Sequence, residues 1–247
     1  VVQVRTSDIN YYVSESVEFE ERFSILPIPP LIGSWVMDMG KSYRNSEFHG
    51  IDVVPVFPAD PKLPNVIFQQ GNIIDGIPYR DGTFDYVILR RLCLSLKAER
   101  WPALLDEMFR VAGKGGYVEL VEINPFYCPI LSDLSTFLIA TVNEICASRG
   151  TDPNISTNLK VFLREAGFVN IQHGFVSIPV GNWGDNKIGG MMGRNYREAL
   201  AAVSPFMAPQ LGKTPKQYDE YLDTCLAECN EFQAYSNAYW AYAQRPM

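Results

Sequence analysis

The feature that most constrains the fold is a regular alternation of short apolar segments with amphipathic helical segments. Apolar stretches predict strands at 50–54, 66–68, 84–89 and 117–123. Between the last two, residues 98–112 place apolar side chains at the three- and four-residue spacing of a buried helix face. Because parallel strands need a crossover connection, which is usually a helix, this alternation predicts an α/β fold with a mostly parallel sheet.

The second half of the chain continues the pattern with a larger share of helix. We expect two further helices and two further strands, at 134–145, 159–166, 169–178 and 237–244. The helix after Thr214 has the clearest start signal, since a threonine N-cap, a proline and a glutamine form a capping box. We expect the helical segment of roughly 183–234 to act as a lid over an active site.

Composition and charge exclude several classes of protein. Hydrophobic residues make up 47% and charged residues 20% of the chain, as is usual for a globular protein with a buried core. A net charge of −7 argues against nucleic acid or an anionic membrane as the main partner. No apolar run approaches the roughly 18 residues of a membrane helix, and no secretory signal is visible. Five scattered cysteines favour a reduced, cytoplasmic location, with the nucleus as the alternative.

Three blocks of sequence correspond to successive elements of one known domain family. They are SWVMDMGKSYRNSEFHGIDVVPVFP, NVIFQQGNIIDGIPYRDGTFDYVILRRL and WPALLDEMFRVAGKGGYVELVEINP. In combination they resemble class I S-adenosylmethionine-dependent methyltransferases, in particular the fungal methyltransferase-domain family that includes regulators of secondary metabolism (LaeA-like). The resemblance implies a Rossmann-like sheet flanked by helices over residues 33–247, preceded by a lead-in segment at 1–32.

The resemblance implies S-adenosylmethionine as cofactor and assigns residues to its adenosine part. Asp52 ends a strand, where an acid accepts hydrogen bonds from both ribose hydroxyls, and Val53 follows it. Asn72 and Ile73 lie where the family contacts the adenine. The residues themselves leave a second interpretation open, in which Asp52 caps a turn and Asn72 is a turn residue.

Other candidates follow the fourth and fifth strands. By resemblance, Arg90 lies at the methionine end of the cofactor and Arg91 at the substrate mouth. Adjacent residues of an extended segment point to opposite sides, so one of these arginines is expected to be a solvated surface charge. Glu122, near the end of the fifth strand, is a weaker candidate for the substrate side.

The glycine-rich turn of the family, which resembles D-x-G-C-G-x-G, is largely missing. Only Gly33 matches it, as the final glycine, in the sequence ILPIPPLIGSW. The central first strand is therefore expected to be absent or replaced. The favoured explanation is a segment lost between Pro30 and Gly33, and the second is a degenerate relative that no longer binds cofactor. A substitute strand at 23–32 comes last, because proline has no backbone N–H to donate to a neighbouring strand.

The function implied by the resemblance is methyl transfer to a small-molecule or protein acceptor. This is an in-line displacement that depends mainly on proximity and orientation, and the sequence names no general base. The chain has only two histidines, so we expect no histidine-rich metal site. The alternative is a catalytically inactive relative, or a truncated gene product, that acts as a binding or scaffold module.

Overall fold

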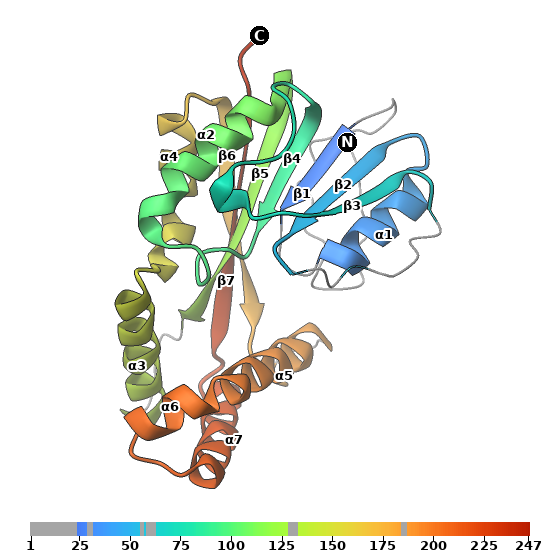
Figure 1. Cartoon of the computed structure of the whole chain (residues 1–247). Coiled ribbons are helices and arrows are strands. Elements are labelled where there is room, and N and C mark those ends of the chain that lie inside the picture. Colours follow the sequence, from blue (N-terminus) through green and yellow to red (C-terminus); the bar gives the residue numbers. More distant parts are fainter. Residues whose placement is uncertain (1–23, 29–31, 55–56, 58–62, 128–132, 184–186) are drawn as a thin grey trace. The chain divides into compact units, whose positions relative to one another are not determined.

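The computed structural model describes residues 24–28, 32–54, 57, 63–127, 133–183 and 187–247 of the 247-residue chain (Figure 1). The chain divides into two compact units. The first consists of Val1–Glu122, Ile155–Gly174 and Tyr239–Met247, and the second of Ile123–Asn154 and Phe175–Ala238.

Seven strands form one sheet with the order β3-β2-β1-β4-β5-β7-β6. They are β1 (Ser24–Ile28), β2 (Glu47–Asp52), β3 (Val66–Gln70), β4 (Phe84–Arg90), β5 (Ala112–Tyr127), β6 (Val169–Pro179) and β7 (Tyr235–Gln244). The pairs β1–β2, β1–β4, β2–β3 and β4–β5 are all parallel. The predicted α/β architecture is therefore confirmed.

Most of the helices lie where the apolar periodicity of the sequence predicts them. The helices and 3-10 turns are α1 (Ile32–Ser42), η1 (Ile73–Asp75), η2 (Ala98–Arg100), α2 (Trp101–Val111), α3 (Asp133–Arg149), η3 (Pro153–Asn158), α4 (Leu159–Glu165), α5 (Lys187–Ala202), α6 (Ser204–Gln210) and α7 (Pro215–Glu231).

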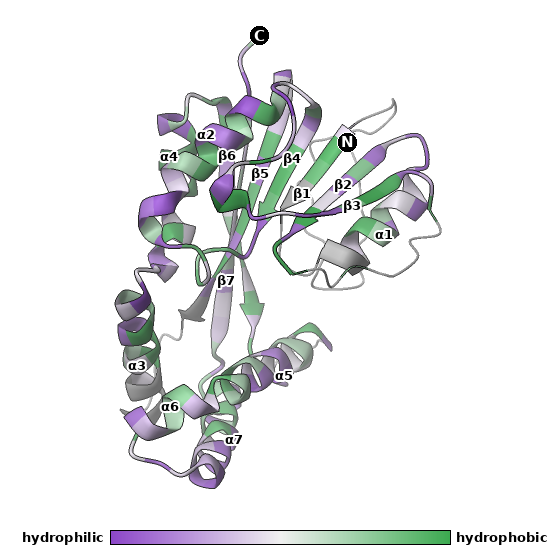
Figure 2. Ribbon diagram, in the orientation of Figure 1, coloured by the Kyte–Doolittle hydropathy of each residue, from purple (hydrophilic) through white to green (hydrophobic). Residues whose placement is uncertain are grey.

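Two hydrophobic clusters cover the two faces of the sheet in the first unit. Along β1, Ile25 joins the cluster that contains α1, whereas its neighbour Leu26 joins the cluster that contains α2 and α4. Tyr86 and Val87 of β4 divide between the clusters in the same way. Successive side chains of a strand point to opposite faces, so these neighbouring residues bury both faces of β1 and of β4. Figure 2 shows hydrophobic residues along both strands.

Of the two alternatives expected for the first strand, absent or replaced, the second is found. Residues Ser24–Ile28 form β1 at the centre of the sheet, although Pro27 lies within it. Their register with β4 runs over four residues from Ile25 to Ile28, while the register with β2 covers only Ser24 and Ile25. The substitute strand, which ranks last among the three explanations, is the arrangement found. Burial of apolar residues on both faces of the sheet stabilises this strand by more than the loss of one backbone N–H hydrogen bond at the proline costs.

The second unit has a hydrophobic cluster of its own between α6 and α7, against which residues of α3 and α5 pack. Its helix α7 begins as predicted, because Thr214 and Gln217 form both halves of the capping box. Tyr218, Leu222 and Cys225 of α7 are buried in this cluster. In the described part of the chain, no helix is both long and apolar enough to span a membrane. The lid role of 183–234 stays a prediction.

Candidate binding site at the carboxyl ends of the parallel strands

Asp52 is the last residue of β2, as the sequence predicts, and its side chain is 8% exposed. Its Oδ1 accepts a hydrogen bond from the backbone N–H of Val54 at 3.0 Å, and its carbonyl accepts one from Gly71 at 3.0 Å. The turn-capping role is therefore present. A carboxylate has about four acceptor positions on its two oxygens, so capping one turn leaves capacity for a ligand.

Val53 follows Asp52 as an exposed apolar side chain at the end of the strand. Its side chain is 56% exposed, and its carbonyl accepts a hydrogen bond from Gln70 Nε2 at 3.1 Å. An apolar group beside a strand-end acid suits contact with the flat face of a heterocycle. The assignment of Val53 to the adenosine side stays a prediction.

Asn72 forms the N-cap of η1, directly after β3. Its Oδ1 accepts a hydrogen bond from Ile74 N–H at 3.2 Å, and its Nδ2 donates to Asp75 at 2.9 Å. Ile73 is partly buried against the cluster that contains α2. The turn role of Asn72 is thus present, and its amide is engaged within the loop. A ligand near Asn72 would meet mainly the backbone of this turn.

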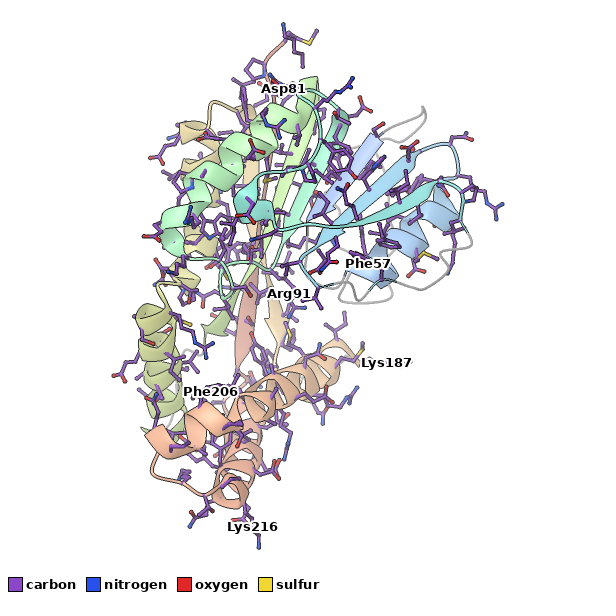
Figure 3. All side chains as sticks on the ribbon, in the orientation of Figure 1. Phe57, Asp81, Arg91, Lys187, Phe206 and Lys216 are labelled. Atoms are coloured by element: carbon purple, nitrogen blue, oxygen red, sulfur yellow. The ribbon has the colours of Figure 1, made fainter. Side chains whose placement is uncertain are left out.

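Arg90 and Arg91 differ in environment, as the alternation predicts. The Arg90 guanidinium lies 5.0 Å from the ring centre of Trp35, and its Nη2 is 3.5 Å from Glu119 Oε1. Arg91 is exposed and has a φ of 57°, at the turn that follows β4 (Figure 3). A positive φ is incompatible with an extended strand, so β4 ends at Arg90 and Arg91 lies in the following turn.

A buried carboxylate sits beside Arg90. Glu119 is 1% exposed and accepts a short hydrogen bond from the hydroxyl of Tyr86. Burial, together with the nearby Glu119 charge, raises the pKa of Tyr86 well above its usual value, so this tyrosine stays protonated and donates. Arg90, Glu119 and Tyr86 are thus linked on the face of the sheet that packs against α1.

Glu122 is completely buried within β5, and the strand continues beyond it to Tyr127, so the prediction that it lies near the strand end is wrong. Its carboxylate accepts hydrogen bonds from the backbone N–H groups of Leu92 at 2.6 Å and of Cys93 at 3.2 Å. Burial raises its pKa to about 7, against the opposing effect of these hydrogen bonds. Glu122 therefore holds the turn after β4, a role that the sequence did not indicate, and its substrate contact stays a prediction.

Gly33 lies in the first turn of α1. Residues 29–31, which connect β1 to α1, lie outside the described residues, and none of them is glycine. The helix therefore begins beside the carboxyl end of β1 without the family's series of glycines. Gly33 as a cofactor contact stays a prediction.

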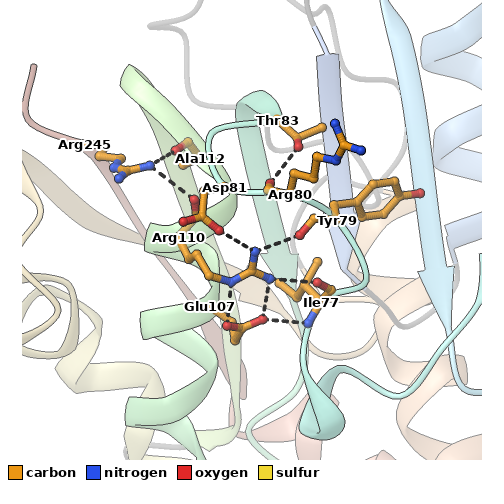
Figure 4. A network of polar contacts seen from close by, with 9 residues as sticks. All are labelled: Ile77, Tyr79, Arg80, Asp81, Thr83, Glu107, Arg110, Ala112 and Arg245. Atoms are coloured by element: carbon orange, nitrogen blue, oxygen red, sulfur yellow. Dashed lines mark hydrogen bonds and ion pairs between the residues drawn. The ribbon is translucent and has the colours of Figure 1, made fainter.

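Two residues that the sequence analysis missed, Glu107 and Arg110, bind the loop between β3 and β4 (Figure 4). Both lie on α2 at a spacing of three, which is a common spacing for surface ion pairs. Only the tertiary structure shows that their partners belong to this loop. Within the described residues, no group of three His, Cys, Asp or Glu side chains could hold a metal ion.

Known proteins that resemble this chain include methyltransferases. A family described as a methyltransferase domain matches residues 32–116. Methyltransferase str3 of Strobilurus tenacellus is 24% identical over 195 residues, which cover 75% of this chain and 67% of that protein. The secondary metabolism regulator LAE1 of Cochliobolus heterostrophus is 27% identical over 180 residues, which cover 68% of this chain and 56% of the regulator.

A solved structure shows the same fold. Phosphoethanolamine N-methyltransferase 2 of Haemonchus contortus, in complex with phosphomonomethylethanolamine and S-adenosylhomocysteine, aligns with a TM-score of 0.55 at 15% identity. The alignment covers 93% of this chain and 50% of that one. The domain match, the fungal relatives and the shared fold together show that the chain is similar to LaeA-like, class I S-adenosylmethionine-dependent methyltransferases.

Proposed function

We propose that this chain binds S-adenosylmethionine and transfers its methyl group to a small-molecule or protein acceptor. The observation that carries the proposal is the position of Asp52, at the carboxyl end of β2 and next to the central strand β1. In open parallel sheets, ligands bind outside the carboxyl ends of the strands, where the strand order reverses. Here the order reverses between β1 and β4, because β2 and β3 lie on one side and β4 on the other.

The donor and acceptor groups on the β2–β3 side fit the adenosine part of this cofactor. The Asp52 carboxylate can accept hydrogen bonds from both ribose hydroxyls, because the turn occupies only one acceptor position on its Oδ1. The exposed Val53 side chain supplies an apolar surface for the adenine ring. The backbone of the turn at Asn72 and Ile73 offers the polar contacts to the edge of the ring.

The other side fits the amino-acid part of the cofactor less completely. The N-terminus of α1 at Gly33 provides the positive end of a helix dipole, which favours a carboxylate. We propose Arg90, whose guanidinium lies over Trp35 of the same helix, as the nearby positive side chain. The glycine turn that would bring further backbone N–H groups to the ligand is missing from the sequence.

The bound cofactor would supply an electrophilic methyl group on a sulfonium, which is a good leaving group. The residues of this chain would then contribute mainly binding and orientation, because an in-line displacement gains most from proximity. Asp52 would fix the ribose, and the turn held by Glu122 would fix the backbone after β4. Arg91, at that turn, is the proposed contact on the acceptor side. A cytoplasmic or nuclear location accompanies this proposal.

Calorimetric titration of the chain with S-adenosylhomocysteine tests the proposal. We expect saturable binding, weaker than that of relatives with a complete glycine turn, and strongly reduced by Asp52→Ala. Binding that is absent at millimolar ligand would overturn the proposal. That result would favour the second candidate function, an inactive binding or scaffold module, to which the missing glycines already point.

A further inference from the structure

We propose that Arg110 of α2 is a positioning residue that holds the adenine-side loop, Gly71–Thr83, in its binding conformation. This inference rests on the proposed function, because it concerns the same cofactor site. Arg110 lies outside that site and acts on it through the loop between β3 and β4. Three sets of contacts bind this one loop (Figure 4).

The first set comes from the Arg110 guanidinium, which binds three groups of the loop. Nη2 donates to the carbonyl of Ile77 at 2.8 Å, and Nη1 donates to the carbonyl of Tyr79 at 2.7 Å. Nη1 also donates to the carboxylate of Asp81 at 3.0 Å. A planar guanidinium presents its donors in a fixed fork, so these acceptors are fixed relative to one another.

The second set comes from Glu107, one helical turn before Arg110. Its Oε2 accepts a hydrogen bond from Ile77 N–H at 2.8 Å. The same carboxylate accepts from Arg110 Nε at 2.8 Å and Nη2 at 2.7 Å, which orients the guanidinium toward the loop. The hydrogen bonds from Arg110 hold the pKa of Glu107 below its usual value, so this carboxylate is charged at neutral pH. Both polar groups of the Ile77 backbone are thus bound by one ion pair.

The third set comes from the backbone at the end of α2. The carbonyl of Arg110 accepts hydrogen bonds from Gly82 N–H at 2.9 Å and from Arg245 Nη1 at 3.2 Å. The side chain and the backbone of Arg110 therefore both bind the loop. The helix that carries them is rigid, because Leu105 and Met108 are completely buried in the core.

These contacts lie next to the proposed adenine contacts in the sequence and in space. Asn72 starts η1, and only Gly76 separates the end of η1 from Ile77. Gly76 has a φ of 106°, and an added Cβ would lie 3.4 Å from Glu107 Oε2. The turn at Asn72 is thus connected to Ile77 through a single glycine with a positive φ, so a shift at Ile77 would move the turn.

Arg110 and Glu107 are about 30% exposed, so their ion pair by itself adds little to global stability. A positioning role therefore predicts a change in ligand selectivity that exceeds the change in stability. Arg110→Lys is the sharpest variant, because lysine keeps the positive charge and loses the planar fork. The matched control is Arg197→Lys, since Arg197 also binds two carboxylates, Asp219 and Asp223, at 2.8 and 2.7 Å in the second unit.

The experiment measures the affinity of the full chain for S-adenosylhomocysteine and for its inosine analogue, in which a carbonyl oxygen replaces the adenine amine. We expect Arg110→Lys to weaken S-adenosylhomocysteine binding about tenfold and to reduce the preference over the inosine analogue about fivefold, because a displaced loop no longer reads the ring edge. Glu107→Gln should change the preference in the same direction by a smaller factor, and Arg197→Lys should leave it unchanged. Melting temperatures of all variants identify any loss of folding.

The outcomes separate the two proposals. An unchanged preference in folded Arg110→Lys and Glu107→Gln variants would overturn the positioning role and leave the proposed function intact. An equal loss of preference in Arg197→Lys would also overturn it, since the effect would then be a general one. If the unmodified chain binds neither ligand, the proposed function fails and the positioning role fails with it.

Discussion

The two sides of the proposed cofactor site are built in different ways. On the β2–β3 side, the contacts come from a side chain, Asp52, and from a loop that Glu107 and Arg110 fasten to α2. On the β1–α1 side, the family uses backbone N–H groups exposed by glycines, and this chain retains only Gly33 of that turn. The first side has the strand-end acid and the loop that the proposal needs, whereas the second has its strand and its helix but lacks the glycines.

The difference shows that strand placement and ligand contact are separate requirements. Burial on both faces places Ile25 and Leu26 at the centre of the sheet whether or not the following turn can bind a ligand. A close backbone approach to a ligand depends on residues without a Cβ, which no amount of core packing supplies.

The largest expected effect is on stability, through the central strand β1. Leu26→Ala removes a fully buried side chain from the central strand and should lower the free energy of unfolding by about 2–5 kcal/mol. Urea denaturation measures this loss. The exposed Val169→Ala on β6 is the control and should change stability by less than about 0.5 kcal/mol. Equal effects of the two variants would contradict the central position of β1.

The next effect concerns pH and Glu122. Its pKa is raised by burial from the ordinary value near 4.5 to about 7, so the folded state holds this proton more tightly than the unfolded state. The associated stability is fully present below about pH 4.5 and is lost as the pH rises through about 7, a change of about 3 kcal/mol.

Glu122→Gln keeps the shape of the side chain and cannot ionise, so this pH dependence should disappear. We expect wild type to lose stability relative to Glu122→Gln between pH 5 and pH 8, as measured by urea denaturation at both values. Exposed Glu165→Gln serves as the control and should track wild type. A constant difference between wild type and Glu122→Gln over this range would contradict the raised pKa.

A slightly smaller effect is expected on the β2–β3 side of the site. Asp52→Ala should weaken S-adenosylhomocysteine binding by about a hundredfold, because two hydrogen bonds to a charged acceptor are lost. Asp52→Asn keeps an oxygen that can accept from Val54 N–H, so it preserves the turn and removes the charge. If calorimetry finds that Asp52→Asn binds as well as wild type, the carboxylate serves the turn and not the ribose.

The smallest effect is expected on the β1–α1 side. Replacing Pro29, Pro30 and Leu31 with a glycine-containing family turn should improve S-adenosylhomocysteine affinity by about tenfold, because new backbone N–H groups reach the ligand. Calorimetry compares this variant with a second one in which the same three residues are replaced by alanine. The comparison separates the effect of adding glycines from the effect of removing the prolines. Equal affinities of the two variants would show that the glycines contribute no ligand contacts here.

The periodic elements were predictable because their information is local. The strand at 84–89, the helix stripe of α2 and the capping box at Thr214 each depend on residues a few positions apart. The apolar pattern placed the second strand at 50–54, and the family resemblance marked Asp52 as its terminal acid; the strand found is Glu47–Asp52. The different environments of Arg90 and Arg91 agree with the expected alternation, although Arg91 lies in the turn after β4 and has a positive φ.

Sequence alone thus determined the α/β class, the strand-end acid and the missing glycines. The tertiary structure decided that Ser24–Ile28 is the central strand, since neighbours on both sides supply its pairing and its burial despite Pro27. It also decided the roles of Arg110 and Glu122, whose partners lie about 30 residues away in the chain. Local patterns carry no information about such partners, because only the folded chain brings a helix or strand to the loop that it holds.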